Sequence, residues 1–263
     1  MSGTLTIVGT PIGNLGDFSP RAVQALEETD FIAAEDTRVT LRLLNHFGIK
    51  KPLVSYYEHN KRERGEQICA RIEAGENCVL VSDAGMPAIS DPGEELVAQC
   101  AERGIPVLAV PGPSAVVTAL ALSGLPTGRF TFEGFLSVNK KSRREHLAQL
   151  TDERRTMVFY EAPHKLPTTL RDLYEALGDR RVALARELTK VHEEVQRTTL
   201  REAAARYADG GARGEFVLVV EGAPEPEQEE TVSLEDAARA VRELAEREGV
   251  SLSEAARRVA ALT

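Results

Sequence analysis

The stretch CVLVSDAGMPAISDPG, residues 78–93, decides the fold class of this chain. It begins with a short, continuous apolar run and passes into a loop of glycine, proline and small side chains, and a helix-like segment follows over 92–103. Continuous apolar runs are typical of strands that are buried on both faces of a parallel sheet. The stretch therefore predicts one strand–loop–helix unit of an α/β fold.

The same unit recurs along the first 125 residues. Ser19 and Pro20, for example, suit the cap and the first position of a helix. This alternation predicts an N-terminal α/β domain over 1–125, with a parallel sheet covered on both faces. The expected strands lie at 5–8, 31–34, 53–56, 78–82 and 107–110, and the expected helices begin near 20, 40, 60, 92 and 114.

Gly124-Leu125-Pro126 interrupts the pattern and predicts a domain boundary. A C-terminal α/β domain of mixed character is expected over 126–221. Its strands are expected near 130–135, 156–160, 182–187, 195–199 and 216–221, with helices near 142–150, 166–177 and 200–207.

The last part of the chain differs in composition. Residues 222–232 are rich in proline and glutamate and predict a linker. Residues 233–263 predict a helical tail of two short helices, because Ser233 with Asp236 and Ser251 with Glu254 have the spacing of a capping box.

Composition and charge exclude several classes of protein. No apolar run approaches the roughly 20 residues of a membrane-spanning helix, and the N-terminus lacks the pattern of a signal peptide. The three cysteines have no metal or disulfide spacing, which indicates free thiols in a reducing compartment and predicts a cytoplasmic protein. The net charge is −9, but much of the acidity lies in residues 221–263, so the body of the chain is close to neutral.

Three loops follow predicted strands on one edge of the first sheet: GTPIGN at 9–14, the loop at 82–93, and PGPSA at 111–115. Ligands of open parallel sheets bind at the carboxyl ends of the strands. Glycine permits close backbone approach and proline fixes the loop shape, so the three loops predict a ligand cleft. The plain alternative is three tight turns without a ligand. Neither a dinucleotide fingerprint nor a P-loop motif is present, and residue patterns alone lead only to a nucleotide-sized ligand.

Six motifs follow one another along the chain: GTPIGN (9–14), SDAGMPAISDPG (82–93), PGPSA (111–115), FEGFL (132–136), ARELTKVHEE (185–194) and GEFVLVVEG (214–222). This ordered set resembles the tetrapyrrole methylase superfamily of class III methyltransferases, and within it the branch that modifies small-subunit ribosomal RNA. The resemblance runs from about residue 4 to residue 221. It implies two α/β domains with S-adenosyl-L-methionine in the cleft between them, no metal, and a homodimer. It also implies 2′-O-methylation of a cytidine ribose in the decoding region of 16S ribosomal RNA, with the RNA of the assembled 30S subunit as the expected substrate.

The resemblance also implies which residues contact the cofactor, mostly through backbone groups. In relatives the tail resembles a small helix-turn-helix module, and the two helices predicted here are expected to form an incomplete one. The implied cofactor contacts are Pro11, Ile12, Asp83, Ala84, Gly85, Met86, Ile89, Ser114, Ala115, Tyr160, Glu161, Ala185, Glu215 and Phe216.

Removing the proton of a ribose hydroxyl calls for a base or a charge partner. His59 has a suitable pKa for a base, and a hydrogen-bonded helix-start residue is the equal alternative. Asp36 is expected to orient Arg38 or the substrate, and Arg38 to hold a phosphate. Lys190 is expected to lower the pKa of the hydroxyl, and an ion pair with the nearby Glu193 and Glu194 is its alternative.

The expected RNA contacts lie in a basic run that opens a helix after the FEGFL strand. Lysine and arginine supply affinity for phosphates without sequence information. The residues are Lys140, Lys141, Arg143 and Arg144, and none of them is expected to take part in cofactor binding.

Two other functions stay open at this point. One is a methyltransferase of the same superfamily that acts on a small tetrapyrrole, against which the basic run and the ARELTKVHEE motif argue. The other is a non-catalytic nucleotide-binding module, against which the polar groups Asp36, Arg38, His59 and Lys190 argue.

Overall fold

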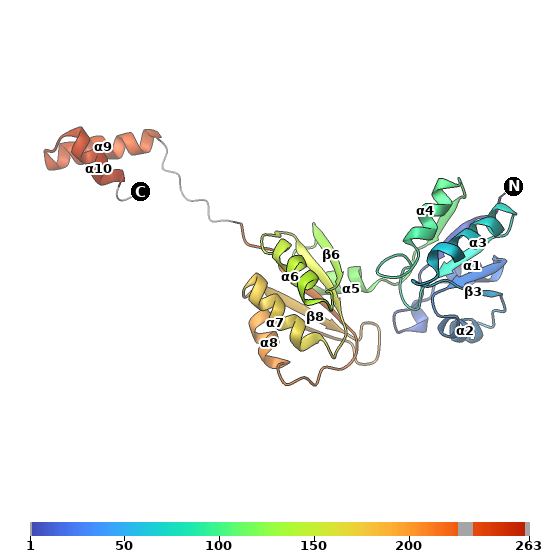
Figure 1. Cartoon of the computed structure of the whole chain (residues 1–263). Helices are drawn as coiled ribbons and strands as arrows, with labels where there is room; N and C mark the ends of the chain where they lie inside the picture. Colours follow the sequence, from blue (N-terminus) through green and yellow to red (C-terminus); the bar gives the residue numbers. More distant parts are fainter. Residues whose placement is uncertain (1, 226–233, 261–263) are drawn as a thin grey trace. The chain divides into compact units, whose positions relative to one another are not determined.

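The computed structural model describes residues 2–225 and 234–260 and divides the chain into two compact units that adjoin in sequence at Ala223 and Pro224. The first unit holds two five-stranded sheets, and the second holds two helices (Figure 1). Across the described ranges, no helix combines the length and the apolarity that a membrane span requires.

The first sheet is parallel throughout, in the order β3-β2-β4-β1-β5, as the sequence predicts. Successive residues of β2 face opposite sides: Phe31 and Ala33 belong to one buried cluster, and Ile32 and Ala34 to another. Both faces are therefore covered by helices. The strands are β1 (Leu5–Val8), β2 (Phe31–Ala34), β3 (Leu53–Ser55), β4 (Cys78–Val81) and β5 (Val107–Val110), and the helices are η1 (Leu15–Asp17), α1 (Pro20–Glu28), α2 (Thr37–His46), α3 (Lys61–Glu73) and α4 (Glu94–Glu102).

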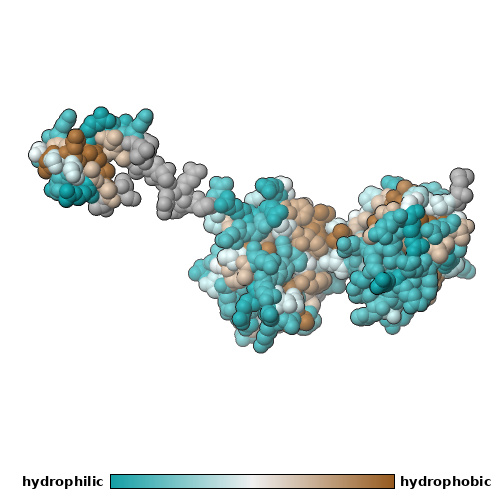
Figure 2. Space-filling view, turned by 45° about the horizontal axis from the view of Figure 1, so that its top comes forward, coloured by the Kyte–Doolittle hydropathy of each residue, from teal (hydrophilic) through white to brown (hydrophobic). Residues whose placement is uncertain are grey.

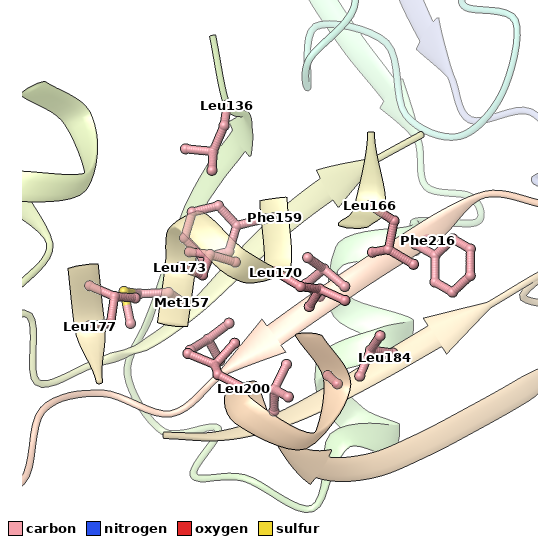
Figure 3. Close-up of a cluster of buried hydrophobic side chains, with 14 of the residues drawn as sticks. Leu136, Met157, Phe159, Leu166, Leu170, Leu173, Leu177, Leu184, Leu200 and Phe216 are labelled. Carbon is pink, nitrogen blue, oxygen red and sulfur yellow. The ribbon is translucent and has the colours of Figure 1, made fainter. Parts of the chain in front are cut away.

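The second sheet is mixed, in the order β6-β7-β10-β8-β9. Strand β6 is parallel to β7, and the other neighbours are antiparallel. One face packs against three helices around a core that includes Phe159 and Leu170 (Figure 3). The strands are β6 (Phe130–Phe135), β7 (Thr156–Glu161), β8 (Arg181–Arg186), β9 (Glu194–Thr199) and β10 (Phe216–Val220), and the helices are α6 (Lys140–Gln149), α7 (Leu166–Leu177) and α8 (Leu200–Arg206).

Helix α5 (Ala115–Ser123) covers the other face of the second sheet, although the sequence groups it with the first. Val116 and Ala119 pack in one cluster with Val158, Ala183 and Val217. The physical reason is that β7, β8 and β10 carry apolar residues on both faces, and the apolar side of α5 is what buries the second of them. Packing thus changes from one sheet to the other before α5, and a domain boundary at residue 125 stays a prediction.

The C-terminal unit consists of α9 (Leu234–Glu248) and α10 (Leu252–Ala260), the two helices that the sequence predicts. The Ser251 hydroxyl accepts the backbone N–H of Glu254 at 3.3 Å, as the capping-box spacing implies, whereas Ser233 lies outside the described residues. The expected linker differs at its start. The Ala223 N–H donates to the Glu153 carbonyl at 2.6 Å, so residue 223 belongs to the first unit, and positions 226–232 fall outside the described residues.

Candidate active site

The three loops predicted to form a cleft meet at one edge of the first sheet. Thr10 and Gly85 exchange two backbone hydrogen bonds, of 2.9 and 3.1 Å, which join the first loop to the second. Gly9 lies against Gly112 of the third loop so closely that a Cβ on Gly9 would be 2.8 Å from the Gly112 Cα and 2.7 Å from the Met86 sulfur. Only glycine permits this approach, so the three loops form one surface.

Beside this surface lies a cavity of ≈ 430 Å³, a size common for small-molecule sites. Its walls come from the loops of the first sheet, from the start of α5, and from strand ends of the second sheet. The lining residues are Ile12, Ala84, Gly85, Met86, Ile89, Ser90, Asp91, Ser114, Ala115, Phe135, Tyr160, Glu161, Ala162, Pro163, Ala185, Glu187, Leu188, Lys190, Glu215, Phe216 and Val217.

The backbone is strained next to the cavity. Among the residues that the structure describes, four that are not glycine have a positive φ: Ala88 (68°), Ser90 (62°), Glu187 (52°) and Thr189 (65°). They occupy only two loops, 83–93 and 187–190, and both loops contribute to the cavity wall. Left-handed residues other than glycine cost about 1–3 kcal/mol each and gather at functional sites, which supports a functional role for this cavity.

The charged side chains of the wall are mainly acidic. The cavity is lined by Asp91, Glu161, Glu187 and Glu215. Among the described residues, Lys190 is the one lysine or arginine in the wall. Burial raises the pKa of Asp91, and the charge of Asp83 adds to this, although a hydrogen bond from Ser82 opposes it. Such a wall suits a cationic ligand better than an anionic one.

Lys190 is held by two of these carboxylates. Its Nζ lies 2.9 Å from Glu187 Oε1 and 3.0 Å from Glu215 Oε2. Burial by itself lowers the pKa of Lys190, but the hydrogen bonds to Glu187 and Glu215 outweigh burial and raise it. Lys190 is therefore protonated at neutral pH and acts as a charge, not as a base. Its partners are not the expected Glu193 and Glu194, because the turn at 187–190 directs it toward Glu187 and Glu215.

Of the expected cofactor contacts, all line the cavity except Pro11 and Asp83. These two line a smaller neighbouring cavity of ≈ 260 Å³. Asp83 Oδ1 accepts the backbone N–H of Asp36 at 3.0 Å, so this side chain joins the loops after β4 and β2. This hydrogen bond gives Asp83 a structural role in the first sheet, and its contact with the cofactor stays a prediction.

Three of the four expected catalytic side chains do not line the cavity. Asp36 caps α2 and binds Arg38 at 2.6 Å, and hydrogen bonds from Arg38 hold the pKa of Asp36 at about 2, which makes it unsuited as a base. The Arg38 side chain is 84% exposed. His59 is exposed in the turn before α3, near the Tyr57 ring. Only Lys190 reaches the cavity.

The basic run lies at the start of α6, beside a groove of ≈ 700 Å³ between α6 and α7. Lys140, Arg143 and Arg144 line the groove together with Lys165. Within residues 2–225 and 234–260, Lys140, Arg144 and Lys165 form no ion pair, whereas Arg143 pairs with Asp172, which also lines the groove. Lys141 lies outside the groove lining and is 85% exposed.

Arg143 differs from the expectation of a free phosphate ligand. Its side chain is only 12% exposed, and its Nε donates to Asp172 Oδ2 at 2.6 Å. The reason is its position on α6, which turns it toward α7 instead of toward solvent.

Several residues of the cavity wall escape the sequence argument, Asp91 and Phe135 above all. Asp91 belongs to the motif at 82–93, so the sequence predicted the loop in which it lies. Its raised pKa depends on burial, which no local pattern reveals. Phe135 ends a strand and is 56% exposed, and its ring lies 5.5 Å from that of Tyr160. Burial raises the pKa of Tyr160 to about 12, so its hydroxyl stays protonated at neutral pH.

Within the described ranges, no group of three His, Cys, Asp or Glu side chains is placed to hold a metal ion.

Asp91→Asn is expected to stabilise the protein at pH 7, because it removes a carboxylate whose ionisation burial opposes. A carboxyl with a raised folded-state pKa makes the native state lose stability as pH rises from the ordinary value, 3.8, through the raised one. The advantage of the variant should therefore shrink as the pH falls toward 4. Urea unfolding at a series of pH values measures this, with the exposed Asp209→Asn as control, and a variant less stable than wild type at pH 7 would contradict it.

Comparison with known proteins agrees with this geometry. The profile of the tetrapyrrole (corrin/porphyrin) methylases matches residues 4–204. A ribosomal RNA small subunit methyltransferase I from a Synechocystis species is 50% identical over 92% of this chain and 87% of its own length. The protein of the same name from Thermotoga maritima is 49% identical over 84% of this chain and 99% of its own length.

Solved structures show the same fold at low identity. A cobalt precorrin-4 methyltransferase superposes with a TM-score of 0.61 at 17% identity, over 83% of this chain and 94% of its own. A uroporphyrin-III C-methyltransferase from Thermus thermophilus, complexed with S-adenosylhomocysteine, gives 0.56 at 19% identity, over 82% and 97%. The chain belongs to the tetrapyrrole (corrin/porphyrin) methylase family and, within it, to the group of the ribosomal RNA small subunit methyltransferase I proteins.

Proposed function

We propose that this protein transfers a methyl group from S-adenosyl-L-methionine to the 2′-hydroxyl of a cytidine ribose in 16S ribosomal RNA. The name shared by relatives at about 50% identity supports the methylation of small-subunit ribosomal RNA. The observation that carries the proposal is the cavity where the three loops meet the second sheet. The 2′-hydroxyl of a cytidine as acceptor rests on the motif resemblance.

The cavity wall fits S-adenosylmethionine in shape and in charge. The first-sheet side is made of glycine, alanine and short loops, which leave backbone groups accessible to a ligand. The acidic wall of Asp91, Glu161, Glu187 and Glu215 suits the positive sulfonium and disfavours the phosphates of a dinucleotide. This argues against the non-catalytic nucleotide-binding alternative.

Bound S-adenosylmethionine supplies an activated methyl group, so positioning accounts for much of the rate. The chain's own residues then bind, orient and remove a proton. Asp91 is suited to take the proton of the hydroxyl, because burial raises the pKa of this cavity carboxylate. Lys190 contributes a fixed positive charge that favours the deprotonated oxygen. Arg38 and His59 are assigned to the RNA instead of the cofactor, since both are exposed on the ligand edge of the first sheet.

The groove between α6 and α7 is assigned to RNA phosphates. Lys140, Arg144 and Lys165 face it without ion-pair partners among the described residues, and Lys141 stands exposed beside it. The groove is close to the cavity along the chain, because Pro163 lines the cavity and His164 and Lys165 line the groove. An RNA backbone held there is near the methyl donor.

The proposal includes a cytoplasmic homodimer that acts on the assembled 30S subunit. Brown hydrophobic patches interrupt the hydrophilic surface of the first unit in Figure 2. Leu108 of the edge strand β5 and Val117 of α5 are 55% and 53% exposed, and apolar side chains exposed to this degree support a self-association surface that includes them. The three free, buried cysteines agree with a reducing compartment.

Ala115→Leu is expected to weaken cofactor binding at least tenfold, because the larger side chain fills the cavity from the first residue of α5 without backbone strain. It is a better test than a change at Gly85, whose φ of 82° makes any larger residue strained. Isothermal titration calorimetry measures the affinity, and Ala121→Leu, exposed on the same helix, is the matched control. Wild-type affinity in a folded Ala115→Leu protein would remove the cofactor from this cavity.

Purified protein with radiolabelled S-adenosylmethionine is expected to label 30S subunits and not a uroporphyrin-type tetrapyrrole. Methylation of a 2′-hydroxyl blocks its attack on the neighbouring phosphate, so the labelled cytidine should resist alkaline hydrolysis as part of a dinucleotide. Label in an alkali-released mononucleotide would place the methyl group on a base. Label in the tetrapyrrole would favour the small-molecule alternative.

The triple change of Lys140, Lys141 and Arg144 to alanine, or of Lys140, Arg144 and Lys165, is expected to weaken binding of 30S subunits. Each lost phosphate contact should reduce the slope of log affinity against log salt by close to one unit. The set with Lys165 should have the larger effect, because Lys141 lies outside the groove. The exposed Lys50→Ala is the control. An unchanged salt slope in both triple variants would make this helix start a solvated surface only.

A further inference from the structure

Arg143 is connected to the cavity wall through one threonine. Its Nη2 donates to the Thr169 Oγ1 of α7 at 2.9 Å, and the Thr169 hydroxyl donates to Glu161 Oε2 in a short hydrogen bond. Glu161 ends β7 and lines the cavity. Thr169 and Glu161 are 1% and 3% exposed, so water does not compete for these groups.

We propose that Arg143 is a positioning residue for the cofactor, which acts through Thr169 on the Glu161 carboxylate, and that it is not an RNA ligand. The inference rests on the proposed cofactor site. Arg143 lines the same groove as its neighbours Lys140 and Arg144, but its side chain is largely buried and its guanidinium is bonded to Asp172 and Thr169. Lys140 and Arg144 keep the assignment to RNA.

The direction of the hydrogen bonds follows from the chemistry of the three side chains. A guanidinium can only donate, and a hydroxyl has a single proton. Arg143 donates to a lone pair of the Thr169 oxygen, so the hydroxyl proton of Thr169 is donated to Glu161. The geometry thus fixes which way the threonine points.

Glu161 is held at both of its oxygens. Oε2 accepts from Thr169, and Oε1 accepts the backbone N–H of Ala162 at 2.8 Å. An ionised carboxylate has about four acceptor positions, so two remain for a ligand. A carboxylate fixed in this way presents acceptors in one orientation to amino or hydroxyl groups of the cofactor, and pre-organisation of this kind favours binding.

Asp172 holds the far end of the arrangement. It binds Arg143 Nε at 2.6 Å, and its other oxygen lies 3.3 Å from Arg171 Nη2. With its guanidinium shared between Asp172 and Thr169, Arg143 has fewer donors left for a phosphate. Arg144, one residue on, has no ion-pair partner among the described residues and supplies a matched comparison.

Four variants of the full chain test the inference: Thr169→Val, Thr169→Ser, Arg143→Met and the control Arg144→Met. Calorimetry without RNA gives the affinity for S-adenosylmethionine. Thr169→Val keeps the shape but removes the hydrogen-bond partner of Glu161 Oε2 and of Arg143 Nη2. We therefore expect about tenfold weaker binding, which corresponds to about 1.4 kcal/mol. Arg143→Met should weaken binding several-fold, whereas Thr169→Ser, which keeps the hydroxyl, and Arg144→Met should bind as wild type does.

The double variant Arg143→Met with Thr169→Val should bind the cofactor no more weakly than Thr169→Val alone, because Arg143 acts only through the threonine. On 30S subunits, Arg144→Met should reduce the salt slope and Arg143→Met should not. Thermal unfolding of each variant identifies loss of fold, and if Thr169→Val does not fold, Arg143→Met against Arg144→Met still decides.

Wild-type cofactor affinity in Arg143→Met, together with a reduced salt slope, would overturn the inference and restore Arg143 as an RNA ligand. Additive effects in the double variant would also overturn it. Failure of the wild-type protein to bind S-adenosylmethionine would instead reject the proposed function, so the two failures are distinguishable.

Discussion

The contact between the backbones of Gly9 and Gly112 is the constraint on which the cavity depends. A Cβ on Gly112 would lie 2.7 Å from the Gly9 carbonyl oxygen, so a side chain at either position would separate the first and third loops. The paired hydrogen bonds of Thr10 and Gly85 join the second loop at the same point. Glycine serves here through the absence of a side chain, whereas at Gly85 the φ of 82° adds a conformational requirement.

The two sheets contribute different chemistry to the site. Loops of the parallel sheet supply backbone groups and small side chains, while strand ends of the mixed sheet supply most of the charge, through Glu161, Glu187, Lys190 and Glu215. Helix α5 connects the two contributions, because its first residue lines the cavity and its apolar side is buried against the second sheet. The third loop is thus where the chain passes from one sheet to the other, and this passage joins both walls of the site.

Opposite charges are separated over a short length of chain. Glu161 at the end of β7 belongs to an acidic cavity wall, and Lys165, four residues on, belongs to a basic groove. A cationic donor and an anionic polymer would each find the sign of charge that attracts it. The hydrogen bonds from Arg143 to Thr169 and from Thr169 to Glu161 connect the groove to the cavity wall.

Local patterns were enough to predict the strands, the helices and the three loops, because apolar runs, caps and turn residues act over a few positions. The composition of the loops also predicted where the first-sheet side of the cavity wall lies, and the motif resemblance named most of the lining residues. Local patterns did not predict which distant residues contact one another. Arg143 reaches Asp172 across 29 positions, α5 packs on the sheet that follows it, and the pKa of Asp91 rises through burial. These three features depend on contacts between segments that are far apart in the sequence. The periodicity of apolar residues reports local structure only and does not predict such contacts.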